Sequence, residues 1–599
     1  MRIGNQGFRA GSMNKPLLLI LLFALLLRII AFSGYTGAYD DTKRSELLHQ
    51  ISEGSWPAYE GDELWVGFLT RTGFLGATTS VIKLLGFSEI SLTLYPLVAS
   101  ILTVFLVYRL ALRWVGRRGA LYASFLFAVF PLDVLFATRI YEDSPLNFFC
   151  TLSVLLFVYA AENPSRRTAF LVSLLAGLAV GVAYLHKVSA GYLCVFFAAV
   201  GIADMLRSRE ILWRHAFLAC GFLLVFLFDL WVNDRLNGDP FFHLHYYARQ
   251  ADILTARSGA ILEWSGGLFG SLKRLFWTFP LGSLISLQLG FFYWFIFPAF
   301  FYCLLKRPSE LALPLFWWAL LAVLINLSSI QGARLPFYSR GTYLISVPGV
   351  LLVARLLEDT GRWTFLERTR SRKAALFIFV ALAATGLVAA GASTVFREPV
   401  VGALAALFRL KTPLLDRASL EIVIGLFTAY LAMSAAACAV FFGLAASRAW
   451  VGERTGRERW LTQLLPVLAA GFLALSSVSF CLIGTRAFPS LEKEAFRALR
   501  ELPPKVTYVD PRMKKFLDFL TAYREPERFV SFEGVDLASL RGAYLVYNRR
   551  ARSLMIQLRE PVAKYSTFVN YPDIEKSVKP DWRVASSLRG GEVVIYEVP

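Results

Sequence analysis

The chain has 599 residues, of which 56% are hydrophobic, and its formal net charge is +19. Because the apolar residues are gathered into long runs, the composition excludes an ordinary soluble protein. The charge does not indicate nucleic-acid binding, because the Lys and Arg residues cluster in short loops between those apolar runs.

About thirteen apolar segments follow one another along the chain. A membrane-spanning helix needs about 20 largely apolar residues, and an open strand would leave backbone groups unsatisfied in lipid. The first segment lacks a small-residue cleavage site and precedes many more spans, so we expect it to be retained rather than removed as a signal peptide. We expect a polytopic α-helical membrane protein with spans at 16–33, 90–108, 119–137, 145–161, 168–184, 189–204, 213–231, 283–304, 312–328, 341–357, 374–392, 420–446 and 461–482.

Basic residues mark alternate ends of these spans. Clusters such as Arg117-Arg118, Arg166-Arg167 and Lys306-Arg307 fall on one side when thirteen spans are drawn. Short cytoplasmic loops carry an excess of Lys and Arg, so we expect a multi-pass protein of the inner (plasma) membrane with a cytoplasmic N-terminus. All six cysteines lie in apolar segments without metal spacing, which argues against a disulfide framework.

Two regions differ in composition. Residues 1–482 are expected to form the membrane domain, with long outer loops at 34–89 and 232–282. Residues 483–599 alternate helix-like and strand-like stretches, which predicts a small extracytoplasmic (periplasmic) α/β domain. Its expected elements are helices at 491–502 and 512–523 and strands at 506–509, 529–532, 544–547, 583–586 and 593–598.

Two adjacent carboxylates, Asp40 and Asp41, directly follow the first span. The segment after them carries Leu47, Leu48 and Ile51 on one helical face, so we expect an amphipathic helix lying along the membrane surface. Such a helix would hold both acids at the boundary where a lipid-borne donor meets a water-soluble acceptor.

Further ionisable residues lie near the outer ends of the spans, where a charge is costly and indicates function by default. Arg forks bind phosphate oxygens and a carboxylate accepts a proton from an attacking hydroxyl, so this mixture suits transfer from a phosphate-linked lipid. Structural roles are the alternatives: Arg28 would snorkel to the interface, and Arg139 would pair with Asp143 along one helix. The residues are Arg28, Arg71, Arg139, Glu142, Asp143, Lys187, Asp229, Arg334 and Arg340.

These motifs resemble the polyprenyl-phosphate-sugar glycosyltransferases of the GT-C fold, in the branch holding the protein O-mannosyltransferases and the lipid A aminoarabinose transferase. The resemblance begins with Asp40-Asp41, Glu53-Gly54 and Arg71-Thr72-Gly73-Phe74. It is detailed over residues 16–205 and implies a GT-C type membrane domain of about thirteen helices. Further matching stretches follow in order at 83–89, 116–120, 142–146, 177–187 and 339–348.

The resemblance implies transfer of a hexose or pentose from polyprenyl phosphate to an extracytoplasmic acceptor, with inversion. Asp40 would be the general base, with Asp41 beside it, and Asp143 would orient the acceptor. The partners implied are the lipid-linked donor, the bilayer, and an envelope lipid, glycan or protein as acceptor.

The leaving phosphate needs cations, for which the resemblance offers Arg71, Arg340 and Lys187. Glu142 and Arg28 are further site candidates.

The resemblance implies that the protein needs no cofactor, because enzymes of that branch mostly work without an obligatory metal. A divalent metal has two possible sites. Asp40, Asp41 and Asp143 offer hard oxygen ligands, and the outer loop offers His243 and His245 near Asp239.

Two other function classes stay open at this stage. One is a multi-span transporter or flippase of a lipid-linked or small-molecule substrate, although the paired repeats and broken midplane helices typical of transporters are not evident. The other is a non-catalytic scaffold or sensor whose C-terminal domain is a binding module.

Overall fold

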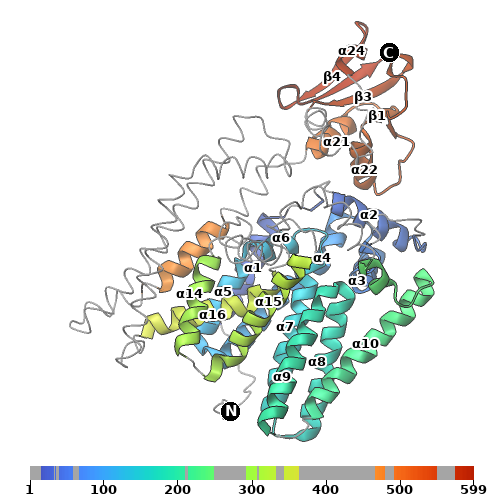
Figure 1. Ribbon diagram of the computed structural model, residues 1–599. Helices are drawn as coiled ribbons and strands as arrows, with labels where there is room; N and C mark the ends of the chain where they lie inside the picture. Colours follow the sequence, from blue (N-terminus) through green and yellow to red (C-terminus); the bar gives the residue numbers. More distant parts are fainter. Residues whose placement is uncertain are drawn as a thin grey trace, which may run out of the picture.

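The computed structural model describes most of a helical bundle and a small α/β unit at one end of it (Figure 1). The predicted spans at 374–392 and 420–446 lie outside the described residues, as does the predicted domain boundary near residue 482. The described residues are 15–32, 34–35, 39–57, 67–208, 213–248, 292–306, 309–331, 343–362, 464, 466–478, 491–549 and 574–599.

Long apolar helices make up the bundle. By length and composition, α4, α7, α8, α9 and α10 are each able to cross a membrane. The described helices therefore confirm an apolar helical bundle, whereas the number thirteen stays a prediction. The helices are α1 (Lys15–Ile30), α2 (Tyr39–Ser52), α3 (Thr72–Leu85), α4 (Glu89–Trp114), α5 (Arg117–Ala128), α6 (Pro131–Ala137), α7 (Asp143–Glu162), α8 (Arg166–His186), α9 (Gly191–Ser208), α10 (Trp213–Asn237), α14 (Phe292–Lys306), α15 (Ala312–Gln331) and α16 (Ser346–Arg362), with another at Pro466–Val478.

The predicted span over 119–137 is bent within the structure. The segment is two helices, α5 and α6, bent by 55° at a short break. Pro131 is the first residue of α6, and its missing N–H and its ring prevent α5 from continuing. The break leaves the Ala128 carbonyl without a helical donor, and Arg28 Nη1 donates to it at 3.0 Å.

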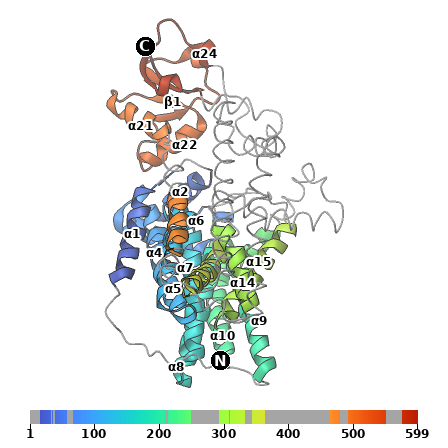
Figure 2. The ribbon, with the colours of Figure 1, turned by 90° about the vertical axis from the view of Figure 1, so that its left-hand side faces the viewer.

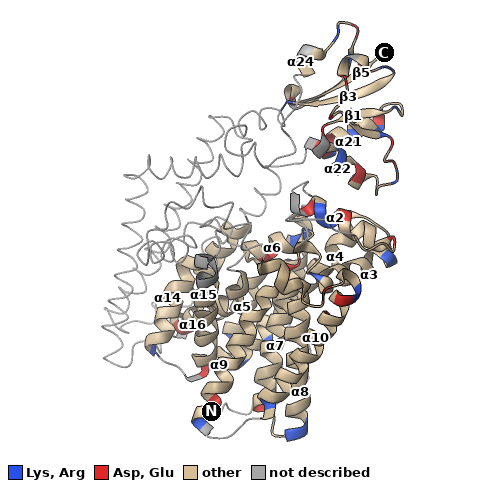
Figure 3. Cartoon of the chain, turned by 45° about the vertical axis from the view of Figure 1, so that its right-hand side comes forward, with Lys and Arg blue, Asp and Glu red and all other residues tan. Residues whose placement is uncertain are grey.

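Helix α7 packs antiparallel to α8 and parallel to α4, since Arg113 near the end of α4 pairs with Glu162 at the end of α7. Helix α10 packs on α8 and runs parallel to it. The turns at Arg117-Arg118 and Arg166-Arg167 therefore lie at the same end of the bundle. Figure 3 shows basic residues at the start of α8, at the end remote from the α/β unit. Glu89, Asp143 and Lys187 lie at the opposite end, because each stands at the other terminus of its helix.

Glycines allow α8 and α10 to approach closely. A Cβ atom at Gly177 would collide with the main chain of Leu218, and one at Gly221 would collide with the main chain of Leu174. Small residues at such a crossing let two helix backbones touch, which is the usual basis of tight helix packing in lipid. A Cβ atom at Gly181 would likewise collide with the side chain of Val225, so packing explains both glycines of the 177–187 stretch.

The C-terminal unit, residues 491–599, has a five-stranded mixed sheet in the order β2-β1-β3-β5-β4. Strand β1 is parallel to β2 and β3, whereas β5 is antiparallel to β3 and β4. All five strands and both long helices lie within three residues of the predicted positions. The elements are α21 (Leu491–Glu501), β1 (Thr507–Val509), α22 (Pro511–Leu520), β2 (Phe529–Ser531), β3 (Ala543–Asn548), α24 (Ile574–Ser577), β4 (Arg583–Leu588) and β5 (Val593–Val598).

The amphipathic helix predicted after Asp40-Asp41 is α2, and its position at the membrane surface stays a prediction. Leu47 is buried with Phe68 and Leu69, and Leu48 is buried with Phe74. The apolar face of α2 therefore packs on protein. Figures 1 and 2 show α2 between the bundle and the C-terminal unit.

Candidate functional site

Glu142 lies at the centre of a charged cluster at the end of the bundle near α2. It is the residue before α7 and its side chain is fully buried. Its Oε2 lies 3.1 Å from Arg44 Nη2, and its Oε1 lies 2.9 Å from Arg71 Nη1. A carboxylate buried to this degree needs such partners, because an unpaired charge out of water costs several kcal/mol.

Lys187 joins the cluster from the C-terminal end of α8. Its Nζ lies 2.7 Å from Asp143 Oδ1 and 3.9 Å from Glu142 Oε1. Three cations therefore surround two carboxylates, and the five side chains together carry one excess positive charge. Such a surplus suits an anionic ligand with several oxygens. We call Arg44, Arg71, Glu142, Asp143 and Lys187 the Glu142 cluster.

Aromatic rings fix both guanidinium groups of the cluster. Arg44 lies over Phe68 and Tyr141, with 4.6 Å and 4.5 Å to the ring centroids, and Arg71 lies 4.8 Å from the Phe68 centroid. Cation–π contacts of this kind strengthen where water is excluded. The Nε of Arg71 is buried and has no hydrogen-bond partner among the described residues, so it offers a donor to a ligand oxygen.

The structure thus brings together Arg71, Glu142, Asp143 and Lys187 from three segments distant in sequence. Arg340 lies outside the described residues. Asp40 and Asp41 stand in the first turn of α2, one turn before Arg44. The side chain of Asp41 is fully buried, and that of Asp40 lies outside the described residues.

Arg44 was missed by the sequence analysis. Lys43-Arg44 looks like part of a solvated helix face, yet Arg44 is only 1% exposed. A signal was present, because Arg44 precedes Leu47 and Leu48 by three and four residues and so shares their face.

Arg28 is buried inside the bundle and does not snorkel to the interface. It forms an ion pair with Asp133, and its Nε donates to Ser100 Oγ at 2.6 Å. The hydroxyl of Tyr343 also donates to Asp133. The site role of Arg28 stays a prediction. Asp133 was missed, although it is the sole acid in the apolar segment 119–137.

The alternative role considered for Arg139, a pair with Asp143 along one helix, is wrong. Arg139 lies in the turn between α6 and α7, so the two residues do not share a helix. The Asp143 carboxylate pairs with Lys187 instead.

The two outer-loop histidines face different partners. His243 is buried, with its Nδ1 2.7 Å from Asp229 Oδ2, whereas His245 is exposed, with its Nδ1 2.7 Å from Asp239 Oδ2. They do not form one metal site. Within the described ranges no group of three or more His, Cys, Asp or Glu side chains converges. The Glu142 cluster also fits a metal ion poorly, because cations already occupy its carboxylates.

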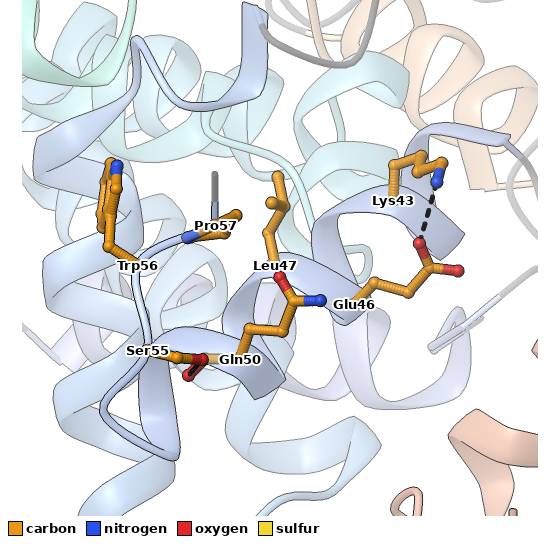
Figure 4. Close-up of a pocket in the computed structure, with 7 residues that line it drawn as sticks. All are labelled: Lys43, Glu46, Leu47, Gln50, Ser55, Trp56 and Pro57. Carbon is orange, nitrogen blue, oxygen red and sulfur yellow. Dashed lines mark hydrogen bonds and ion pairs between the residues drawn. The ribbon is translucent and has the colours of Figure 1, made fainter. Parts of the chain in front are cut away.

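A polar hollow of about 370 Å³ lies along α2 (Figure 4). The ammonium of Lys43 lies 3.0 Å from Glu46, and the indole of Trp56 donates to Asn237 Oδ1 at 3.1 Å. Leu47, which lines the hollow, follows Asp40 by seven residues, which is about two helical turns on the same face. The lining residues are Lys43, Glu46, Leu47, Gln50, Ser55, Trp56 and Pro57.

A second hollow, of about 440 Å³, is apolar and lies between α8, α9 and α10. One of its lining residues, Val180, precedes Lys187 by seven residues, so the hollow lies about 10 Å from the cluster along α8. The lining residues are Val180, Cys194, Phe197, Ala198, Gly201, Ile202, Met205, His215, Ala216, Leu218, Ala219 and Phe222.

Known proteins resemble the chain in sequence over one region and in fold over nearly its whole length. A family model described as dolichyl-phosphate-mannose-protein mannosyltransferase matches residues 77–231. The crystal structure of ArnT from Cupriavidus metallidurans in the apo state matches with a TM-score of 0.52 and 15% identity, over 97% of this chain and 97% of that one. The chain has the GT-C fold. The resemblance to membrane glycosyltransferases is therefore confirmed, in sequence over residues 77–231 and in fold over nearly the whole chain.

Two further relatives were found. The structure of the same ArnT bound to undecaprenyl phosphate matches with a TM-score of 0.50 and 15% identity, over 96% of this chain and 97% of that one. An uncharacterized protein of Aquifex aeolicus (strain VF5) is 27% identical over 269 residues, 44% of this chain and 48% of that protein. The chain thus spans about half the length of this sequence relative.

Proposed function

We propose that the protein is an integral membrane glycosyltransferase that moves a sugar from polyprenyl phosphate to an extracytoplasmic acceptor. The observation that carries the proposal is the Glu142 cluster, in which three cations gather beside the helix that bears Asp40 and Asp41. The similarity to mannosyltransferases and the ArnT fold support it. That an ArnT crystal was obtained with undecaprenyl phosphate supports the donor class.

The leaving phosphate would be bound by Arg71 and Lys187, with Arg340 as a third candidate and Arg44 as an addition from the geometry. As the bond from sugar C1 to the phosphate oxygen breaks, negative charge grows on the phosphate. Cations that are already fixed stabilise that charge without reorganising. Arg71 is suited to this, because its Nε has no partner among the described residues and its ring contact with Phe68 fixes the guanidinium plane.

The attacking group would be an acceptor hydroxyl or amine, and Asp40 would accept its proton. The new bond joins the acceptor oxygen or nitrogen to C1 from the face opposite the phosphate, so the configuration at C1 is inverted. Asp143 would orient the acceptor while it holds Lys187 at 2.7 Å. General-base catalysis of this kind contributes about 10²–10⁴ in rate. No step requires a metal ion.

The two hollows suggest where the rest of each substrate lies. The apolar hollow between α8, α9 and α10 would hold part of the polyprenyl chain, because its lining is apolar and one lining residue, Val180, lies about two helical turns from Lys187. The polar hollow on α2 would hold the acceptor, because it runs along the helix face that carries Asp40.

The orientation we propose follows the positive charges. Since the turns at Arg117-Arg118 and Arg166-Arg167 lie at one end of the bundle, that end would face the cytoplasm of a plasma-membrane protein. The Glu142 cluster and the C-terminal unit would then lie on the extracytoplasmic side.

A donor screen tests the proposal. Purified protein is incubated with a panel of polyprenyl-phosphate sugars, and released polyprenyl phosphate is followed over time. We expect release with at least one donor and its loss in Asp40→Asn, with normal expression and folding. The matched control Asp239→Asn, which removes an outer-loop carboxylate outside the cluster, should keep the rate. Full activity in Asp40→Asn would exclude Asp40 as the base.

A sealed-vesicle experiment distinguishes a transporter or flippase. A transporter moves substrate across the membrane without consuming lipid-linked sugar, whereas a glycosyltransferase releases polyprenyl phosphate in detergent as well. Movement without release would overturn the proposed function.

A further inference from the structure

Helix α22 of the C-terminal unit is apolar on two faces. Met513 and Leu517 pack on the sheet with Val546. Phe516 and Phe519 point the other way and are buried with Tyr35 and Leu48 from the first outer loop. A surface helix normally has one apolar face. The second apolar face of α22 therefore indicates a specific packing contact with α2 and with the residues just before it.

The contact is made by stacked rings. Phe519 stacks on Tyr35 with ring centroids 3.8 Å apart and an interplanar angle of 13°. Tyr523 stacks on His49 of α2 at 4.4 Å and 17°, and its hydroxyl lies 3.4 Å from Ser45 Oγ. Phe87 meets both C-terminal rings edge-on at 5.7 Å. We call Phe516, Phe519 and Tyr523 the C-terminal clamp.

The backbone beneath the clamp is strained. Ala522 and Tyr523 have φ values of +52° and +58°, in the left-handed region that residues with a Cβ rarely adopt. Hydrogen bonds from Ala522 N to Phe519 O at 2.9 Å and from Tyr523 N to Asp518 O at 2.7 Å hold this turn. Strain of this kind persists where the surrounding structure enforces it, and here it directs the Tyr523 ring onto α2.

An ion pair anchors the same contact beside the clamp. Lys493 Nζ of α21 lies 2.6 Å from Glu89 Oε1 at the start of α4. The same oxygen accepts the main-chain N–H of Tyr35 at 3.0 Å. The C-terminal unit therefore contacts the chain before α2, α2 itself, and the start of α4.

Helix α2 depends on such contacts. It has 14 residues, a length at which an isolated helix is marginal in water. One face carries Arg44, which pairs with Glu142, and another carries His49, which contacts Tyr523. Because Asp40 and Arg44 stand on the same short helix, a shift of α2 displaces both with respect to the Glu142 cluster.

We propose that the C-terminal clamp positions α2 for the reaction, with Phe519, Tyr523 and His49 as positioning residues that act through Asp40 and Arg44. This inference rests on the proposed function. The membrane-embedded part would then bind the donor by itself, and the clamp would set the distance between the base and the sugar. A displacement of about 1 Å at a reacting group costs up to roughly 10²-fold in rate.

The test compares Tyr523→Ala and Phe519→Ala with Tyr523→Phe, which keeps the ring, in full-length protein with a transferring donor. The control Tyr508→Ala removes a ring from the opposite face of the sheet, where Tyr508 packs with Phe532. We expect kcat to fall roughly 10- to 100-fold in the two clamp variants, with KM for the donor and the Kd for polyprenyl phosphate changed less than about twofold. Tyr523→Phe and Tyr508→Ala should keep kcat.

Amide hydrogen exchange separates positioning from simple loss of structure. Exchange should quicken in α2 and stay unchanged in α7 and α8 of Tyr523→Ala. The inference is overturned if kcat is kept while α2 exchange quickens, if α2 exchange stays unchanged, or if donor binding and exchange in α7 and α8 are lost together with kcat. Should the wild type turn over no donor at all, the proposed function fails. The exchange of α2 in Tyr523→Ala then still decides whether the clamp holds the helix.

Discussion

The guanidinium of Arg28 and the carboxylate of Asp133 form an ion pair in which both side chains are completely buried. The pair bridges the break between α5 and α6. Arg28 donates to the carbonyl of Ala128, the last residue of α5, and Asp133 stands in the first turn of α6. A cation at a helix C-terminus and an anion at a helix N-terminus both complement the helix dipoles.

Breaking this pair should destabilise the bundle strongly. Asp133→Asn removes the partner of a buried guanidinium, which costs roughly 3–5 kcal/mol. The matched control is Asp204→Asn, whose carboxylate pairs with Arg214 while both side chains are about a quarter exposed. That change should cost less than about 1 kcal/mol. Unfolding in one detergent at rising denaturant measures both, and equal losses would contradict the prediction.

Filling the apolar hollow should weaken binding of long donors. Ala198→Trp places an indole in the hollow lined by Phe197 and Phe222, so part of a polyprenyl chain is excluded. Each buried methylene contributes about 0.8 kcal/mol, and losing two or three raises KM about tenfold or more. A donor with a short prenyl chain should be unaffected. Leu171→Trp, on an exposed part of α8, is the control. An equal effect on short and long donors would contradict this use of the hollow.

Filling the polar hollow on α2 should instead affect the acceptor. Gln50→Trp occupies space beside Trp56 and Leu47 (Figure 4). We expect KM for the acceptor to rise about tenfold or more while KM for the donor stays constant, since losing two hydrogen bonds costs about 1–3 kcal/mol. Ser80→Trp, on the exposed side of α3, serves as the control. A rise in donor KM alone would show that the hollow belongs to the donor.

Acid should loosen the contact between α2 and the C-terminal clamp. Burial lowers the pKa of His49 below its usual 6.5, while Glu53 opposes the shift. The undocked state therefore binds more protons, so docking is strongest above about pH 6.5 and weakens as the pH falls through that value. Burial raises the pKa of the Asp518 carboxyl on α22, while its contact with Lys514 opposes the shift.

The measurement is exchange of α2 amides between pH 8 and 5.5, corrected for the intrinsic pH dependence of exchange. Wild-type α2 should become less protected on acidification. His49→Phe keeps a ring for Tyr523 to stack on and has no proton to bind, so its protection should stay constant. Loss of protection in both proteins would assign the effect to another group.

Local patterns predicted the elements well. The strands of the C-terminal unit alternate or run apolar over short stretches, and α2 carries its leucines at helical spacing, so both were found from neighbours in sequence. The bend at Pro131 was signalled by a proline but was read as part of one span, because periodicity cannot separate a straight apolar helix from a broken one.

Long-range pairing was beyond the sequence. Arg71, Glu142, Asp143 and Lys187 were singled out because charge is unusual at a membrane boundary, yet nothing local says that Glu142 is their centre. Arg44 lies 98 residues from its partner Glu142, and Arg28 lies 105 residues from Asp133. Such pairs form only when distant helices pack together, and the arrangement of helices cannot be derived from one sequence.

The two apolar faces of α22 have a practical consequence. A fragment made of residues 491–599 would keep its sheet-facing core but present Phe516, Phe519 and Tyr523 to water. Exposed aromatic surface of that kind promotes self-association. The fragment would therefore tend to aggregate on expression by itself, and polar substitutions at these three positions are the natural way to make it soluble.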